Sequence, residues 1–298
     1  MEPGALTTDE IRSQPEVWRR AAARAAELSS LLPPSGTRLA VVGCGTSYFI
    51  AQAFAAAREA RGLGETDAFA ASEMPESRTY DGILAISRSG TTTEVARLIR
   101  ARSGRQPIVA VTAVRDTPVF EAADAVLLLD FADERSVVQT RFATGTLAML
   151  RAALGEDLEP AVADAERALA LTPPATGAGH SHFVFLGCGW TVGIANEAAL
   201  KMREAAGAWA ESYPAMEYRH GPISISGPGS AVWAFGEVPG DVVRDVEATG
   251  ATVVRNGLDP MAQLVLAQRT AVARATAAGR DADHPHQLTR SVVLEDGV

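Results

Sequence analysis

LAVVGCGTSYFIAQAFAAAREA (Leu39–Ala60) and FVFLGCGWTVGIANEAALKMREA (Phe183–Ala205) are two versions of one pattern: a short apolar run, a Gly-Cys-Gly turn and an Ala-rich helix. A shift of 144 residues aligns the two triplets and places Ile50–Ala51 on Ile194–Ala195. Identical turns at the same strand-to-helix junction, with further identities downstream, indicate an internal repeat. The chain is therefore predicted to have two similar lobes, each with a glycine turn at the carboxyl end of its first strand.

Short apolar runs alternate with amphipathic segments around both turns, which predicts an α/β fold with two tandem, doubly wound parallel sheets of the flavodoxin type. We expect strands at Arg38–Val42, Asp67–Ala71, Ile83–Ile86, Ile108–Val111, Ala125–Leu129, Phe183–Leu186, Val232–Phe235 and Thr252–Arg255. We expect helices at 7–33, Ser47–Arg61, Thr93–Arg102, Pro118–Ala123, Gln139–Leu154, Leu158–Leu171, 194–206 and Asp259–Ala277. Thr172–Gly177 has the composition of a linker. The predicted division is an N-terminal helical segment (1–34), a first lobe (35–171) and a second lobe (178–298).

The bulk composition narrows the class of protein. The chain has 298 residues, 47% of them hydrophobic, and a net charge of −9, which argues against a general nucleic-acid binder. Its two cysteines have no CxxC spacing, so a disulfide framework or structural zinc site is not expected. The acidic start lacks the features of a signal peptide, and no apolar stretch reaches membrane-spanning length. We expect a cytoplasmic protein.

The helix that follows the second glycine turn carries three charged residues on one face. Glu197, Lys201 and Glu204 have i, i+4 and i+7 spacing. Lys201 is the only lysine, and the other basic residues among the 27 Lys plus Arg are all Arg. A compact, titratable amine does chemistry that a guanidinium cannot. The alternative is an ordinary i,i+4 surface pair of Glu197 with Lys201.

Two strand-to-helix junctions of the first lobe are rich in hydroxyls. In the first, Thr46 and Ser47 follow the glycine turn, and the second is Ser87–Glu94, which holds five hydroxyls, one Arg and one Gly at a predicted helix start. Hydroxyls, free N–H groups and a cation together favour phosphate binding, although either junction could be an ordinary helix cap. Neither is a Walker loop. A third polar stretch, Glu134–Arg141, could line the same cleft or cap a helix.

His220 stands in a predicted loop beside Gly221-Pro222, 16 positions after Glu204. A lone histidine is more often structural, but a carboxylate and an imidazole form a workable proton-transfer pair near neutral pH. No ligand spacing for a metal is present among the five histidines, so neither a metal nor another cofactor is expected.

These residues together resemble the sugar isomerase (SIS) domain family. The resemblance is to the tandem-domain isomerase half of the glucosamine-6-phosphate synthases and to the related hexosamine-6-phosphate deaminases and deglycases. It covers almost the whole chain and rests on CGTS (Cys44–Ser47), SxSGxT (Ser87–Thr92), the Glu197–Glu204 text followed by AESYPAMEYRHGP from Ala210, and the tail DADHPHQLTRSVVLE (Asp281–Glu295).

The resemblance implies a role for each matching residue. Glu204 would move a proton between C1 and C2 of the sugar, His220 would assist ring opening from the partner subunit of a homodimer, and Lys201 would lie near the sugar carbons. Substrate and phosphate contacts are implied at Thr46, Ser47, Ser87, Arg88, Ser89, Thr92, Val137, Gln139 and Arg290.

Two departures from the family pattern change the expected reaction. No glutaminase domain precedes the lobes, so glutamine-dependent amination by this chain is not expected. Arg290 replaces the synthases' Schiff-base lysine, and a guanidinium cannot deprotonate to attack a carbonyl. We expect an isomerase or deaminase of an amino sugar 6-phosphate, with a small sugar phosphate as its partner and neither nucleic acid nor membrane. The alternatives are a non-catalytic phosphosugar sensor and a ketose/aldose isomerase of a non-aminated sugar phosphate.

Overall fold

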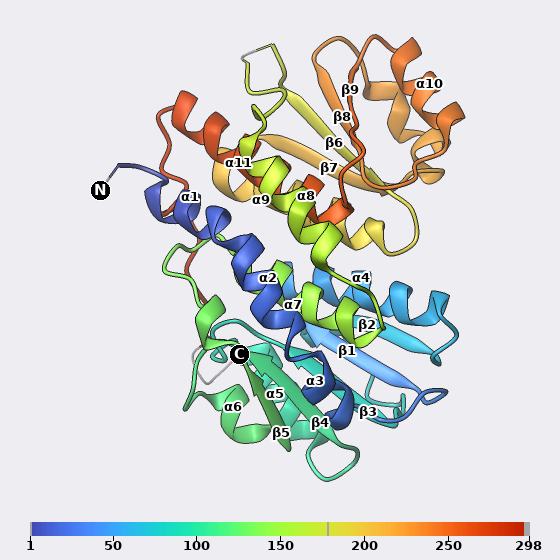
Figure 1. Cartoon of the computed structure of the whole chain (residues 1–298), viewed down its shortest axis with the longest axis vertical. Helices are drawn as coiled ribbons and strands as arrows, with labels where there is room; N and C mark the ends of the chain where they lie inside the picture. Colours follow the sequence, from blue (N-terminus) through green and yellow to red (C-terminus); the bar gives the residue numbers. More distant parts are fainter. Residues whose placement is uncertain (1, 178, 295–298) are drawn as a thin grey trace. The chain divides into compact units, whose positions relative to one another are not determined.

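The computed structural model of the chain describes residues 2–177 and 179–294 (Figure 1). Glu295, the last residue of the tail segment quoted above, lies outside the described residues. The contacts divide the chain into two compact units, each built on one sheet. The five-strand unit contains the described residues of Glu16–Glu134, Arg141–Leu158 and Thr289–Val298. The four-strand unit contains those of Met1–Pro15, Arg135–Thr140 and Glu159–Leu288.

The sheet of the five-strand unit is parallel and has the strand order β2-β1-β3-β4-β5. Its strands are β1 (Leu39–Gly43), β2 (Thr66–Ala70), β3 (Gly82–Ile86), β4 (Ile108–Thr112) and β5 (Ala125–Leu128). Every residue of β1, β3 and β4 is buried, as expected for central strands of a parallel sheet that is covered on both faces. Leu39 pairs in register with Thr66 on one side and Gly82 on the other.

Helices cover both faces of this sheet (Figure 1). On one face, Val95 and Ile99 of α5 and Val119 of α6 form a buried cluster with β1, β3 and β4. On the other, α4 packs against β1 and α7, and α3 packs against α7. The bounds are α2 (Gln14–Ala22), α3 (Ala25–Leu31), α4 (Thr46–Ala60), η1 (Ala71–Glu73), α5 (Thr93–Arg102), α6 (Pro118–Ala122), η2 (Asp130–Ala132) and α7 (Arg141–Ala153).

The four-strand unit repeats this plan with the order β7-β6-β8-β9, again parallel. Helix α10 packs on one face, and α9 packs against β6, β7 and α11. Helices α1 and α8 pack on α11. The bounds are α1 (Ala5–Arg12), α8 (Glu159–Ala170), β6 (His182–Gly187), α9 (Thr191–Ala206), β7 (Trp209–Pro214), η3 (Glu217–His220), η4 (Pro222–Ile225), β8 (Ser230–Ala234), α10 (Gly240–Ala248), β9 (Thr252–Val254) and α11 (Pro260–Ala277).

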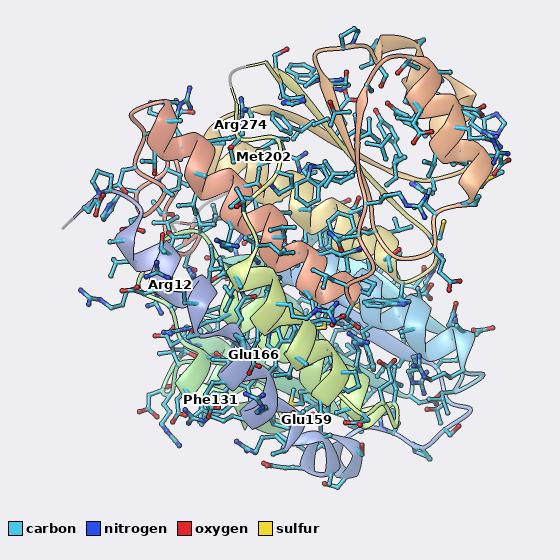
Figure 2. The ribbon with its side chains drawn as sticks, turned by 45° about the horizontal axis from the view of Figure 1, so that its top comes forward. Arg12, Phe131, Glu159, Glu166, Met202 and Arg274 are labelled. Atoms are coloured by element: carbon cyan, nitrogen blue, oxygen red, sulfur yellow. The ribbon has the colours of Figure 1, made fainter. Side chains whose placement is uncertain are left out.

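Helix α11 also holds the segment that leads into β6. Arg274, labelled in Figure 2, donates hydrogen bonds to the carbonyls of Ala175, Gly177 and His180. Its guanidinium lies 4.6 Å from the centre of the Phe183 ring. One partly buried arginine therefore fixes the path of the chain between α8 and the second sheet.

The two glycine turns have the same backbone geometry. Gly45 and Gly189 both have φ of 54°, a left-handed conformation in which glycine is favoured. A Cβ on Gly43 would lie 2.7 Å from the Ser47 carbonyl carbon, and one on Gly187 would lie 2.3 Å from the Thr191 oxygen. The triplet therefore recurs because the helix after each strand begins too close to the turn for a side chain.

The predicted parallel α/β architecture is confirmed, with several differences in detail. The single helix predicted over 7–33 is divided into α1, α2 and α3, because Ser13 bonds back to the Glu10 carbonyl and Pro15 has no N–H to continue α1. The segment 209–214, predicted only as an extended run, is strand β7, and α10 was not predicted. His220 lies in the 3₁₀ turn η3 and not in a loop. In the described part of the chain, no helix is long and apolar enough to cross a membrane.

Candidate active site

The first glycine turn of the five-strand unit places two hydroxyls at the start of α4. Thr46 and Ser47 are buried at 4% and 3% exposure. The N–H of Ser47 donates to the Cys44 carbonyl, which closes the turn at the carboxyl end of β1. The carboxyl edge of an open parallel sheet is where ligands of this fold class bind.

The loop after β3 brings more hydroxyls to the same edge of the sheet. Ser87 and Ser89 are 3% and 7% exposed, and Thr91 donates to Ser89 from both its N–H, at 3.2 Å, and its hydroxyl, at 3.0 Å. Ser87 Oγ is buried and has no hydrogen-bond partner among the described residues. A buried hydroxyl without a partner is unusual in a native structure and is suited to an additional ligand. Thr92 ends the loop as the N-cap residue of α5.

Arg88, predicted to contribute its charge to phosphate binding, contacts protein groups in the structure. Its guanidinium is 1% exposed, lies 3.6 Å from the Glu134 carboxylate and donates to the Arg290 carbonyl at 2.8 Å. Arg290 in turn forms an ion pair with Asp133 on the surface of the same unit. The side chain of Arg88 therefore connects the loop to Glu134 and to the C-terminal tail.

The charged face of α9 is buried in the four-strand unit. The side chains of Glu197 and Lys201 are 0% and 1% exposed, whereas that of Glu204 is 19% exposed. Lys201 Nζ lies 2.5 Å from Glu204 Oε2 and 3.4 Å from Glu197 Oε1. The alternative of a surface pair is wrong, because α9 packs against α11 and buries this face. Lys201 Nζ therefore lies within ion-pair distance of two carboxylates, one of them fully buried.

Glu204 also lines a cavity of about 470 Å³ within the four-strand unit. Ala205 of α9 also lines it, and the segment after α11 forms the rest of the wall, with the residues Arg280, Asp281, His284, Pro285 and His286. His284 Nδ1 lies 3.0 Å from the Asp281 carboxylate. Sequence reasoning missed Arg280 and the two histidines; their polar composition, in a segment already matched to the family, was the available signal.

His220 does not belong to the described wall of this cavity. It is exposed at the end of η3, beside Arg219, which is paired with Asp241 and Asp245. Within the described four-strand unit, the structure therefore does not bring His220 into the group formed by Glu204 and Lys201.

Val137 and Gln139 lie in the segment that precedes α7. The N–H of Val137 donates to the Asp283 carbonyl at 3.3 Å, and Gln139 Oε1 is buried. Asp283 is itself a hub, since its carboxylate accepts from the N–H groups of Leu6 and Thr7, at 3.0 and 2.8 Å, and from the Thr7 hydroxyl. The segment after α11 thus fixes both α1 and the stretch that carries Val137.

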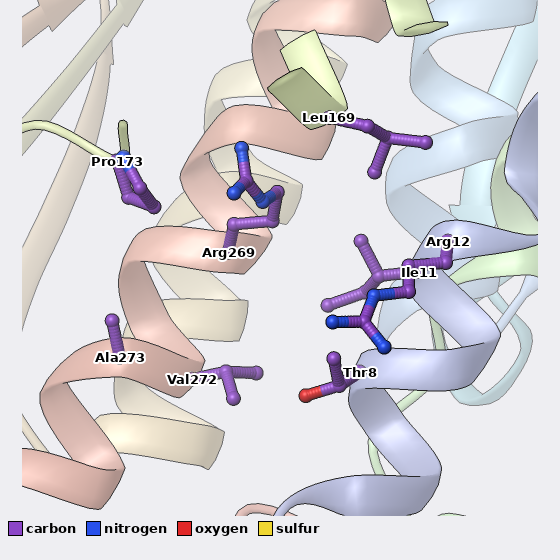
Figure 3. Close-up of a pocket in the computed structure, with 8 residues that line it drawn as sticks. All are labelled: Thr8, Ile11, Arg12, Leu169, Pro173, Arg269, Val272 and Ala273. Atoms are coloured by element: carbon purple, nitrogen blue, oxygen red, sulfur yellow. The ribbon is translucent and has the colours of Figure 1, made fainter. Parts of the chain in front are cut away.

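A second cavity of about 250 Å³ in the four-strand unit contains none of the predicted residues (Figure 3). Its lining comes from α1, α8, α11 and the segment after α8: Thr8, Ile11, Arg12, Leu169, Pro173, Arg269, Val272 and Ala273. Arg269 donates to the carbonyls of Ala168 and Leu171 at the end of α8, so it already serves as a helix cap.

Residues 34–154 match the family model of the SIS domain. This part of the chain is an SIS domain. The family resemblance seen in the sequence is thereby confirmed. The whole chain is 28% identical to the glutamine–fructose-6-phosphate aminotransferase [isomerizing] of Aeropyrum pernix over 87% of its own length and 51% of that protein. It is 27% identical to the enzyme of the same name from Legionella pneumophila, over 99% of its own length and 57% of that protein. It therefore spans about half the length of these curated relatives.

Solved structures share the fold of the whole chain. A glucosamine-6-phosphate deaminase from Thermotoga maritima superposes with a TM-score of 0.84 and 24% identity, covering 97% of this chain and all (100%) of that one. A tagatose-6-phosphate ketose/aldose isomerase from Escherichia coli superposes with a TM-score of 0.78 and 20% identity, covering 96% of this chain and 100% of that one. At these identities the likeness establishes the α/β fold with two parallel sheets, which is common to phosphosugar isomerases and deaminases.

Proposed function

We propose that this protein is an isomerase or deaminase that acts on an amino sugar 6-phosphate by proton transfer between C1 and C2. The observation that carries the proposal is Glu204, a carboxylate on the wall of a cavity with a buried ammonium 2.5 Å from one of its oxygens. Moving a proton between adjacent carbons needs one positioned base that takes the proton and returns it. Glu204 has the exposure and the fixed partner for that role.

Lys201 is assigned to hold Glu204 and not to act as a nucleophile. An amine attacks a carbonyl only when it is deprotonated and reachable. Lys201 is 1% exposed and has a carboxylate on either side, both of which favour the ammonium. Since Arg290 cannot form an imine either, the proposed chemistry is proton transfer. In deamination this transfer leaves an imine at C2 of the sugar, and water hydrolyses it to the ketone and ammonia.

The phosphate group is assigned to the loops of the five-strand unit. The donors are the hydroxyls of Ser47, Ser87, Ser89 and Thr92 and the N–H groups at the starts of α4 and α5. Anions bind well at such helix starts because the first N–H groups have no partner within the helix. The buried Ser87 hydroxyl, which has no hydrogen-bond partner among the described residues, is consistent with this assignment. Arg88 stabilises the loop through its ion pair with Glu134.

His220 is assigned to ring opening, supplied by the partner subunit of a homodimer. Its exposure on η3 and its absence from the described Glu204 cavity support a role toward a second copy of the chain. The curated relatives are named aminotransferases, and this chain spans about half of them.

The test is Glu204→Gln, assayed with glucosamine 6-phosphate for ammonia release and, separately, for ketose formation. We expect turnover to fall by about 10²–10⁴-fold, the range for loss of a general base, with substrate binding nearly intact. Glu166→Gln, on an exposed carboxylate of α8 labelled in Figure 2, is the matched control and should keep full activity.

Unchanged turnover in Glu204→Gln would sink the proposal. Ketose formation from a non-aminated sugar phosphate, with no ammonia from the amino sugar, would assign the chain to the ketose/aldose isomerases. Tight binding of sugar phosphates with no turnover by the wild type would identify a sensor.

A further inference from the structure

The described part of the C-terminal tail runs across the loop that follows β3. Arg88 Nη2 donates to the Arg290 carbonyl at 2.8 Å, and the N–H of Thr93 donates to the Val292 carbonyl at 3.2 Å. The N–H of Leu294 donates to Thr93 Oγ1 at 2.9 Å. The tail is thus hydrogen-bonded to both ends of the loop that we assign to the phosphate.

Ser291 lies at the centre of this contact. Its Oγ is 3.0 Å from Ser89 Oγ, 2.9 Å from Thr91 Oγ1 and 3.4 Å from Thr92 Oγ1. Ser89 and Thr91 are themselves 3.0 Å apart, so three hydroxyl oxygens form a closed triangle with every edge at hydrogen-bond length. Two corners belong to the loop and the third belongs to a residue about 200 positions away.

The number of hydroxyl protons in this triangle explains the effect of Ser291. Each hydroxyl has one proton to donate and two lone pairs that accept. The three hydroxyl protons are enough for one hydrogen bond along each side of the triangle. When an anion binds, one hydroxyl donates its proton to the anion, and the other two hydrogen bonds still connect the three oxygens. Without Ser291 only the edge between Ser89 and Thr91 remains, and their hydroxyls regain rotational freedom. Donors that are oriented in advance bind an anion at a lower entropic cost.

We infer that Ser291 is a positioning residue of the phosphate site, acting through the hydroxyls of Ser89 and Thr91. The inference rests on the proposed function, in which this loop binds the phosphate. The anchor of the tail is buried: the Arg88 guanidinium, backed by Glu134, binds the carbonyl directly before Ser291. The surface ion pair of Arg290 with Asp133 fixes the same residue from outside.

The experiment compares Ser291→Ala and Ser291→Thr with the wild type. Inorganic phosphate binding is measured by isothermal titration calorimetry, and KM and kcat are measured with glucosamine 6-phosphate. We expect Ser291→Ala to weaken phosphate binding about tenfold, the lower range for a hydrogen-bond network on a charged ligand. KM should rise with kcat within about twofold, because phosphate binding is shared by ground and transition states. Ser291→Thr, which keeps the hydroxyl, should restore binding.

Ser30→Ala is the matched control, since its exposed hydroxyl in the same unit donates to the Glu27 carbonyl and is far in sequence from the loop. It should bind phosphate as the wild type does. Equal or tighter phosphate binding by Ser291→Ala would overturn the inference and make the tail a competitor of the anion. Equal losses in the Ala and Thr variants, with kcat and thermal midpoint falling together, would reduce Ser291 to a structural role.

The same data separate this inference from the proposed reaction. Phosphate binding that depends on Ser291, in a protein that does not turn over any amino sugar phosphate, would leave the inference standing and remove the proposed activity. No phosphate binding by the wild type would sink both.

Discussion

The two turn-and-helix segments share one backbone and divide the chemistry between them. The turn at Gly43 continues into Thr46 and Ser47, whereas the turn at Gly187 continues into Trp190 and Thr191. The Thr191 hydroxyl is already used within its own unit, since it contacts the Cys188 N–H and the carbonyls of Cys188 and Phe235. The second turn thus uses its hydroxyl to hold the turn closed, whereas the first turn places Ser47 buried at the edge of its sheet.

In the helices after the turns, the second unit carries the polar residues and the first carries apolar ones. The repeat places Glu197, Lys201 and Glu204 of α9 opposite three alanines of α4: Ala53, Ala57 and Ala60. Ala53 and Ala57 are buried, as are Glu197 and Lys201. One scaffold therefore accepts either methyl groups or a buried ion pair at the same positions. The charges on α9 are thus not a requirement of the fold, which supports a functional reason for them.

The largest loss of stability that tests this comparison is expected from Lys201→Ala. It removes the cation and leaves the Glu197 carboxylate buried, so the free energy of unfolding should fall by about 3–5 kcal/mol. Urea denaturation followed by circular dichroism measures the loss.

The double variant Glu197→Ala/Lys201→Ala copies the α4 pattern at both buried positions. It should be more stable than Lys201→Ala alone, because the double variant removes the buried carboxylate together with the cation that neutralises it. A double variant that loses the sum of the two single losses would show that the pair is not coupled.

A smaller effect is expected from filling the turns. Gly187→Ala should lower the free energy of unfolding by about 1–3 kcal/mol, and Gly43→Ala by less, because the added Cβ meets backbone at 2.3 Å in the first case and 2.7 Å in the second. Gly177→Ala, with open space around the added atom, is the control. Thermal denaturation of the three variants should rank them in this order, and equal midpoints would mean that the turns relax freely.

The smallest effect concerns the cysteines between the glycines. Burial raises the pKa of the Cys44 thiol to about 11, and burial also raises the pKa of Cys188. A raised pKa lowers the thiolate fraction, so Cys44 should react slowly with iodoacetamide at pH 8 and speed up about tenfold per pH unit toward pH 11. Mass spectrometry of the Cys44→Ser and Cys188→Ser variants follows each thiol alone. Fast labelling of Cys44 at pH 8 would contradict its burial in the turn.

Local pattern was sufficient for most of the fold. The repeat located both glycine turns, and the predicted bounds of Thr93–Arg102 coincide with α5 because a hydroxyl cap and an apolar period mark both ends. The i, i+4, i+7 spacing of Glu197, Lys201 and Glu204 correctly placed them on one face of α9. Strand β7 was harder to predict, because Glu211, Ser212 and Pro214 give this edge strand a polar composition without a clear alternation of apolar and polar residues.

The parts that sequence could not supply depend on long-range contacts. Helical spacing is the same for a surface pair and a buried one, and only packing against α11 decides that Lys201 is buried. The composition of the loop after β3 predicted a cation at Arg88 that binds phosphate, whereas in the structure its guanidinium contacts Glu134 and the tail. Nothing local to Ser291 indicates the hydroxyls that it meets.

The capping of α1 by Asp283 makes the completion of this helix a long-range event in folding. The N–H groups of Leu6 and Thr7 lie 277 and 276 positions before the carboxylate that accepts from them. The contact between Ser89 and Ser291 spans 202 positions. Contacts between distant parts of a chain form only after the entropy of loop closure has been paid. We therefore expect both contacts to form late in folding, after the strands and helices around them.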